Sequence, residues 1–120
     1  MKYSDQLKHP KWQKRRLEIL EAADWKCEDC GSTNSQLEIH HCFYIQGINA
    51  WEHGRDLLIC VCHGCHVVRQ KWERALHVSV ARVFRFKTQA EIEAEAWSWI
   101  DRDITQAQAR WREDLCRNAS

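Results

Sequence analysis

The hydrophobic positions near the start of the chain recur with the period of a helix. The periodic segment begins at about Pro10 and ends at about Ala23. Its apolar residues Trp12, Ile19 and Leu20 fall on one side of a helical wheel, and charged residues fall on the other. Proline suits the first turn of a helix, where its missing N–H costs no hydrogen bond. The pattern therefore predicts an amphipathic helix packed on the core, whose basic side is either solvated or turned toward phosphate.

Two short strands are predicted after this helix. Residues 37–40 alternate between apolar and polar side chains, and Leu57–Val61 form an apolar run that suits a return strand. The residues between them, 42–56, contain two glycines and show no sustained period. This interval is expected to be a loop longer than a hairpin turn.

A second helix is predicted to open within the segment Cys62-His-Gly-Cys-His66. Beyond this segment an apolar residue recurs at every fourth position, which is a helical spacing. Valines beyond Leu76 also suit a strand, so both structures remain open for that part of the chain. The recurring residues are Val68, Trp72, Leu76, Val80 and Phe84.

A last helix is predicted near the C-terminal end of the sequence. Thr88-Gln-Ala-Glu91 is a capping-box pattern, and neither glycine nor proline follows it. The apolar residues beyond it step by three and four, as in a packing seam. This seam either closes over the core or pairs with a second copy or another protein. Its members are Trp97, Ile100, Ile104, Ala107 and Trp111.

Composition and charge describe a small protein without a strong overall preference for nucleic acid. The chain has 120 residues and a net charge of +1 at pH 7. Basic residues nevertheless gather at 8–16 and 69–87, and acidic residues gather at 90–103, which predicts polarised faces. The N-terminal residues are polar and the seven cysteines are odd in number, so we expect a reducing cytoplasm. No apolar run approaches the roughly 20 residues that cross a bilayer.

The cysteines form a pattern that is typical of a zinc site. Two C-x2-C pairs are separated by 31 residues. Two intervening residues let both thiolates of a pair reach one ion, and two pairs complete a tetrahedral sulfur shell with no open position. Such a site is structural, and we expect it to hold Zn²⁺ and to tie the first helix to the second. The predicted ligands are Cys27, Cys30, Cys62 and Cys65, with His63 as an alternative in the second pair.

Two other interpretations of the cysteines are weaker. A redox pair would need only one C-x2-C, and buried free cysteines would not be expected at matched spacing. Cys42, Cys60 and Cys116 have no place in the zinc site and are expected to serve as small apolar residues.

Histidines gather beside the predicted zinc site. Residues 37–66 contain five of the seven histidines. His40 and His41 end the first predicted strand, and His66 directly follows the second cysteine pair. Hydrolysis of a phosphodiester needs a base that takes a proton from water and a cation that neutralises charge on the phosphate. Imidazole can act as that base and can also hold that cation.

These residues together resemble the HNH endonuclease family, whose members have the ββα-metal fold. The resemblance covers residues 10–69 and rests on PKWQKRRLEIL before CEDCG, then LEIHH, a loop containing Trp51-Glu52, and LLICVCHGCH. It is similar to the phage and prophage subset in which two C-x2-C pairs hold zinc. The resemblance implies an α+β fold: a small ββα-metal core at 1–87 that carries the zinc site of four cysteines and an N-terminal helix. Residues 88–120 would then be a long C-terminal helical extension that packs on the core or on a partner.

The resemblance also implies a function, that of a metal-dependent DNA endonuclease in the bacterial cytoplasm. His41 takes the position of the general base that activates water. His40 and His66 take those of ligands to a catalytic Mg²⁺, Mn²⁺ or Zn²⁺. The ion would stabilise the charge on the phosphate and the departing 3′ oxygen, and the product would be a nick with a 5′-phosphate.

One position departs from the family pattern. Just before the return strand the family has an asparagine that braces the loop or binds the metal, whereas this chain has Leu57. His53, Asp56 or water would then supply a third ligand. The alternative function is a catalytically inactive binding module, which kept the zinc scaffold and acts by binding DNA or a protein.

DNA contacts are expected from basic residues near the site in sequence, because a small site of this kind meets the phosphate backbone first. Trp25 and Trp51 could stack on bases, although loop tryptophans more often cap a small core. The candidate phosphate contacts are Lys11, Lys14, Arg15, Arg55 and Arg69.

Overall fold

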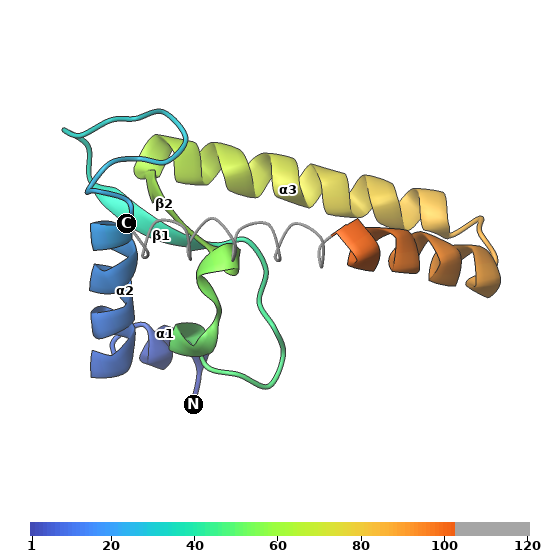
Figure 1. The fold of residues 1–120 in the computed structure, drawn as a ribbon, viewed down its shortest axis with the longest axis horizontal. Coiled ribbons are helices and arrows are strands. Elements are labelled where there is room, and N and C mark those ends of the chain that lie inside the picture. Colours follow the sequence, from blue (N-terminus) through green and yellow to red (C-terminus); the bar gives the residue numbers. More distant parts are fainter. Residues whose placement is uncertain (103–120) are drawn as a thin grey trace, which may run out of the picture. The chain divides into compact units, whose positions relative to one another are not determined.

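A computed structural model of the chain describes residues 1–102 (Figure 1). It is a mixed α+β structure with a two-stranded antiparallel sheet, as the hydrophobic pattern predicts. The described residues fall into two compact units, one of residues 1–74 and one that begins at Ala75. The elements are α1 (Tyr3–Gln6), α2 (Pro10–Ala22), β1 (Leu37–His41), η1 (Ala50–Glu52), η2 (Arg55–Leu57), β2 (Leu58–Cys62) and α3 (His63–Phe84), followed by a helical segment at 89–102.

Helix α2 confirms the prediction of an amphipathic helix. It begins at Pro10, and the Nδ1 atom of His9 caps it by accepting a hydrogen bond from the backbone N–H of Lys11 at 3.1 Å. After its last turn Asp24 and Trp25 adopt left-handed backbone conformations, with φ of 57° and 56°. The N–H of Trp25 donates back to the carbonyl of Leu20 at 3.0 Å, which satisfies an end of the helix and turns the chain toward the first cysteine pair.

The two predicted strands, β1 and β2, pair in an antiparallel hairpin with a long loop, with Leu37 opposite Cys62 and His41 opposite Leu58. Successive side chains of a strand point to opposite faces, and directly paired residues share a face. Leu37, Ile39 and His41 therefore lie on one face of β1, and Glu38 and His40 lie on the other. This alternation decides which elements each histidine can reach.

The core of the first unit lies between α2, η1 and the hairpin. Its buried residues are no more than 5% exposed, and they come from elements that are far apart in sequence. A second, smaller cluster forms around the cysteines at Cys27 and Cys62, together with Val61. The members of the larger cluster are Trp12, Ile19, Leu20, Ala50, Leu58 and Cys60, so Cys60 is the small apolar residue that the sequence predicts.

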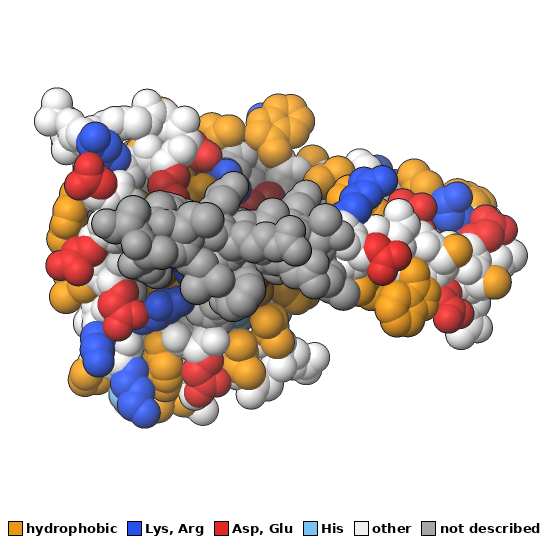
Figure 2. Space-filling view, in the orientation of Figure 1, with side chains coloured by type: hydrophobic (Ala, Val, Ile, Leu, Met, Phe, Trp, Pro, Cys, Tyr) orange, Lys and Arg blue, Asp and Glu red, His pale blue; other side chains and the backbone are white. Residues whose placement is uncertain are grey.

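Helix α3 continues to Phe84, so the part beyond Leu76 is helix and not strand. None of its residues, all of which the structure describes, is buried. The apolar repeat is largely exposed, and hydrophobic side chains reach the surface among charged ones (Figure 2). The exposed members of the repeat are Val68, Trp72, Leu76 and Val80.

The helical segment at 89–102 has the predicted cap. The hydroxyl of Thr88 accepts a hydrogen bond from the backbone N–H of Glu91 at 3.2 Å. Trp97 and Ile100 of the predicted seam are exposed, whereas residues 104, 107 and 111 and Cys116 lie outside the described residues. Within residues 1–102 no helix is long and apolar enough to cross a bilayer.

The packing of α2 can be tested with two leucines of the same helix. Leu20 is 2% exposed and Leu17 is 50% exposed. Leu20→Ala should lower the free energy of unfolding by about 2–5 kcal/mol, because it removes buried apolar surface and leaves a cavity. Leu17→Ala should change it by no more than about 0.5 kcal/mol. Urea denaturation of both variants measures the difference, and equal losses would contradict this packing.

Candidate metal centres and active site

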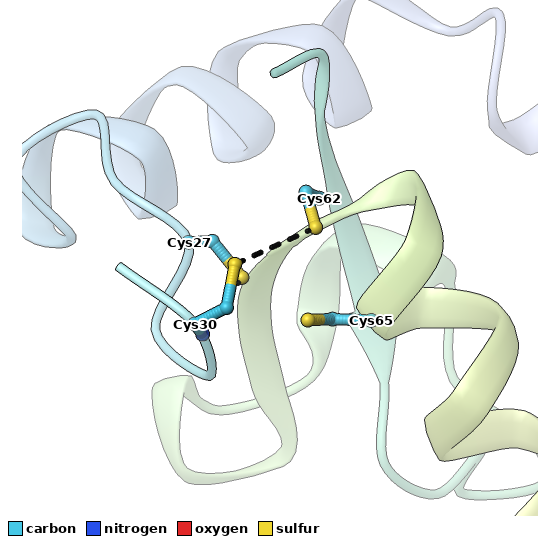
Figure 3. A group of neighbouring side chains, drawn as sticks. All are labelled: Cys27, Cys30, Cys62 and Cys65. Atoms are coloured by element: carbon cyan, nitrogen blue, oxygen red, sulfur yellow. Dashed lines mark hydrogen bonds between the residues drawn. The ribbon is translucent and has the colours of Figure 1, made fainter. Parts of the chain in front are cut away.

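The cysteines of the two C-x2-C pairs converge into one cluster, the four-cysteine group, as their spacing predicts (Figure 3). Cys27 and Cys30 lie in the turn after α2, Cys62 ends β2, and Cys65 lies in the first turn of α3. Their sulfur atoms all lie within 4.8 Å of one another, and those of Cys30 and Cys62 are 3.8 Å apart. A tetrahedral ion with sulfur at about 2.3 Å needs sulfur atoms separated by about 3.8 Å. The group could therefore hold a metal ion such as zinc.

Backbone hydrogen bonds hold the first cysteine pair against β2. The N–H of Gly31 donates to the carbonyl of Cys27 at 2.8 Å, and Gly31 takes the left-handed φ of 78° that this tight turn requires. Glu28, between the two cysteines, donates its N–H to the Cys60 carbonyl at 2.8 Å. Its carboxylate accepts the N–H of Cys60 at 2.7 Å. The turn is thus fixed to the strand that carries Cys62.

The thiols of this group differ in acidity because their hydrogen-bond partners differ. Burial raises the pKa of Cys27, but hydrogen bonds from the backbone N–H groups of Cys30, Cys62 and Asp29 outweigh it and lower the pKa to about 6. The side-chain hydrogen bond with Cys62 raises the pKa of Cys65 to about 12. The thiolate of Cys27 therefore forms more readily than that of Cys65. A divalent cation would favour the thiolate form of all four side chains.

Zinc binding by this group can be tested with two cysteine variants. Cys30→Ser should lose one equivalent of tightly bound zinc per chain and unfold at a lower temperature, because one ligand of the sulfur shell is gone. Cys60→Ala should keep the zinc, because Cys60 is packed in the core. Metal analysis and thermal denaturation measure both effects. Zinc content in Cys30→Ser equal to that of the parent would contradict the assignment.

The Glu38 and His40 face of β1 meets the first turns of α3. The carboxylate of Glu38 accepts hydrogen bonds from Nδ1 of His63 at 2.9 Å and from Nδ1 of His66 at 2.5 Å. Burial would raise the pKa of Glu38, but these hydrogen bonds outweigh it and lower the pKa. Because the Nδ1 of His66 carries the proton, its Nε2 keeps a lone pair that can bind a cation.

The rings of His40 and His66, the two predicted ligands of the catalytic ion, are adjacent. Their ring centroids are 4.9 Å apart, and His40 is 6% exposed. Nε2 of His40 lies 2.8 Å from a carboxylate oxygen of Glu73, one turn of α3 beyond Arg69. The ligand atoms of His40, Cys42 and Glu73 all lie within 4.8 Å of one another, so this group could also hold a metal ion.

His41 lies apart from this pair, among the residues of α2 and the loop. It is 4% exposed, and its ring stacks between those of Trp12 and Tyr44, with centroids 5.0 and 4.4 Å away. Its Nε2 donates to the carbonyl of Ala50 at 3.1 Å, which leaves the lone pair on Nδ1. Burial lowers the pKa of His41, so the ring is held neutral. The structure thus gives the two neighbouring histidines different environments.

His53 holds the loop that positions His41. Its Nδ1 donates to the carbonyls of Asn49 and Ala50 at 3.1 and 3.2 Å, and its Nε2 accepts the N–H of Ile45 at 2.9 Å. Both ring nitrogens are therefore engaged within the loop. Among residues 1–102, neither group of possible metal ligands includes His53 or the exposed Asp56.

Leu57 acts through its backbone. Its carbonyl accepts the N–H of Cys42 at 2.8 Å, and its N–H donates to the carbonyl of Gly54 at 3.0 Å. The loop is also braced by Asn49, whose backbone and side-chain N–H groups donate to the carboxylate of Glu52 at 3.1 and 3.0 Å. An asparagine does brace this loop, eight residues before Leu57.

The candidate DNA contacts separate into two kinds. Lys11, Lys14 and Arg15 line an open depression of about 510 Å³, together with Glu18, Trp51 and residues 52–54. Arg15 also pairs with the carboxylate of Glu18 at 3.0 Å and donates to the carbonyl of His53 at 3.2 Å. Arg55 and Arg69 are not among the residues that line the depression, and each pairs with a carboxylate near the first cysteine pair. Arg55 pairs with Glu28 at 2.8 Å, and Arg69 pairs with Asp29 through two contacts at 2.5 and 2.9 Å.

Comparisons with models of known protein families, with curated proteins and with solved structures found no match for this chain.

Sequence reasoning missed Glu38, Cys42 and Glu73. Glu38 and Cys42 are two residues before and after His40, and Glu73 is seven residues after His66. These are the spacings of one face of a strand and one face of a helix, so the signal was present. The sequence alone does not show that these two faces meet in the folded protein.

Proposed function

We propose that this protein is a metal-dependent endonuclease of the HNH type, with a structural zinc ion in the four-cysteine group. The observation that supports the proposal is the difference in surroundings between two adjacent residues at the end of β1. His40 lies with His66 and two further possible ligands, and His41 is held as a neutral base. A phosphodiester hydrolase needs both a cation and a base.

His41 is suited to take a proton from water. Its lowered pKa keeps it neutral near pH 7, and its Nδ1 has the free lone pair that a base needs. The Ala50 carbonyl fixes the ring orientation and stabilises the cation that forms once the proton has been accepted. The loop bonds of His53 keep that carbonyl in place.

His40 and His66 are suited to hold the cation. Their rings are adjacent, and the hydrogen bond from His66 to Glu38 orients the free Nε2. A divalent ion held there would neutralise the charge that builds on the phosphate. The depression lined by Lys11, Lys14 and Arg15 borders the loop that orients His41, and it would receive the phosphate backbone of DNA.

The role of His41 can be tested by plasmid nicking. His41→Ala should abolish nicking of supercoiled plasmid in the presence of Mg²⁺, Mn²⁺ or Zn²⁺, because no base remains to activate water. His77→Ala should cleave like the parent, because His77 is exposed on α3. His41→Asn serves as a second variant that keeps a polar side chain in the same space.

Thermal denaturation and zinc content separate catalysis from folding in these variants. Both His41 variants should keep the zinc of the four-cysteine group, because none of its ligands has changed. A folded, zinc-loaded His41→Ala protein that nicks at the rate of the parent would overturn the assignment.

A second candidate function is a binding module without turnover. The observation that favours it is the enclosure of His41 between the rings of Trp12 and Tyr44. This enclosure leaves His41 only 4% exposed. If the parent protein binds DNA but cleaves it with none of the three ions, this function replaces the first.

Contact with DNA can be tested through its dependence on salt. Replacing both Lys11 and Lys14 with alanine should weaken binding and reduce the slope of log K against log salt by about 2, because each lost phosphate contact removes about 0.9. Lys26→Ala should leave the slope nearly unchanged, because Lys26 lies beyond the other end of α2. Fluorescence anisotropy at several salt concentrations measures this. Equal slopes for the parent and the double variant would exclude the depression as the phosphate site.

A further inference from the structure

We propose that this protein has a second metal site, separate from the four-cysteine group, whose ligands are His40, Cys42 and Glu73. This second site binds an ion that takes thiolate ligands, such as Zn²⁺, in preference to Mg²⁺. The inference deepens the proposed function by adding Cys42 and Glu73 to His40 as ligands and by naming the class of ion, and the role of that ion in cleavage rests on the proposed function. Metal binding itself does not depend on cleavage.

The three ligands are brought together by the hairpin and α3. His40 and Cys42 are two residues apart, so they share a face of an extended chain. The hydrogen bond from the Cys42 N–H to the Leu57 carbonyl, at 2.8 Å, continues the ladder beyond His41 and keeps Cys42 in that register. Glu73 reaches the same point from α3, and the ligand atoms lie within 4.8 Å of one another.

A hydrogen bond now joins two of the proposed ligands. Nε2 of His40 and a carboxylate oxygen of Glu73 are 2.8 Å apart and share a proton. In the metal-bound site each of these two atoms would bind the ion instead. Ligand atoms around a tetrahedral zinc ion are about 3.3–3.8 Å apart. The three groups therefore need only small side-chain rotations to enclose an ion. His66, whose ring centroid is 4.9 Å from that of His40, lies beside this group and is not one of its three ligands.

The four-cysteine group helps to orient Glu73. Asp29 lies between Cys27 and Cys30, and its carboxylate binds the guanidinium of Arg69. Arg69 in turn lies 3.6 Å from the other carboxylate oxygen of Glu73. Residues that hold a ligand by a second hydrogen bond or ion pair fix its orientation toward a metal. The turn that carries the first cysteine pair thus also supports the second site.

The ligand types decide which ion fits. Mg²⁺ takes oxygen ligands and keeps several waters, so a thiol and an imidazole suit it poorly. Sulfur, nitrogen and one carboxylate oxygen suit Zn²⁺ or Co²⁺. A site with three protein ligands also leaves a position for water or a phosphate oxygen, which a closed shell of four sulfur atoms does not.

The test is a count of bound ions on the full chain. Metal-free protein dialysed against Zn²⁺ with excess Mg²⁺ should bind two equivalents of zinc per chain. With Co²⁺ as the probe, the second equivalent should add to the sulfur-to-cobalt absorption, because Cys42 supplies a thiolate. Cys42→Ser and Glu73→Gln should each bind one equivalent and keep the absorption of the four-cysteine group.

Two control variants should leave the amount of bound metal unchanged. Cys60→Ala and Glu93→Gln should bind two equivalents, because Cys60 lies in the core and Glu93 is exposed on the helical segment at 89–102. Retention of one equivalent and of cooperative thermal unfolding shows that the Cys42 and Glu73 variants remain folded. One equivalent in the parent, or two in both ligand variants, would overturn the second site.

The second metal site and the endonuclease activity can be confirmed or rejected independently of each other. Two equivalents in a parent protein that cleaves no DNA would support the metal site and reject the endonuclease. Conversely, full cleavage by Cys42→Ser that has lost the second ion would overturn the catalytic role of this ion while leaving the endonuclease in place.

Discussion

The convergence of four cysteines is the constraint on which the first unit depends. The core between α2 and the hairpin has six buried members, and a small core alone contributes little stability. The sulfur group joins the turn after α2, the end of β2 and the start of α3 at one point. It therefore fixes the start of α3 at the end of β2, from which the first turns of α3 reach β1.

The contacts between β1 and α3 assemble the candidate chemistry. Alternation along β1 sends Glu38 and His40 toward α3, where they meet His66 and Glu73. The same alternation sends His41 to the opposite face, against α2 and the loop. The proposed base, His41, and one of the proposed cation ligands, His40, are thus successive residues that face opposite sides of the strand. A phosphate would have to lie at the end of β1 to meet both.

The two possible metal sites are physically coupled. Asp29 belongs to the cysteine turn, Arg69 bridges it to α3, and Glu73 is held in front of His40. A change in the cysteine turn would therefore alter the orientation of a ligand in the other site. Structural stability and the candidate chemistry of this protein are connected through one arginine.

The sequence by itself determined the features that depend on local spacing. Pro10 and the apolar period placed α2, alternation placed β1, and the matched C-x2-C pairs brought Cys27, Cys30, Cys62 and Cys65 together. These could be predicted because each pattern lies within a few residues or has a known geometry of its own. Tertiary structure alone decided that Glu73 meets His40, that His53 braces the loop, and that Leu57 acts through its carbonyl. Those contacts depend on how β1 faces α3 and on the path of the loop, and no local spacing encodes either.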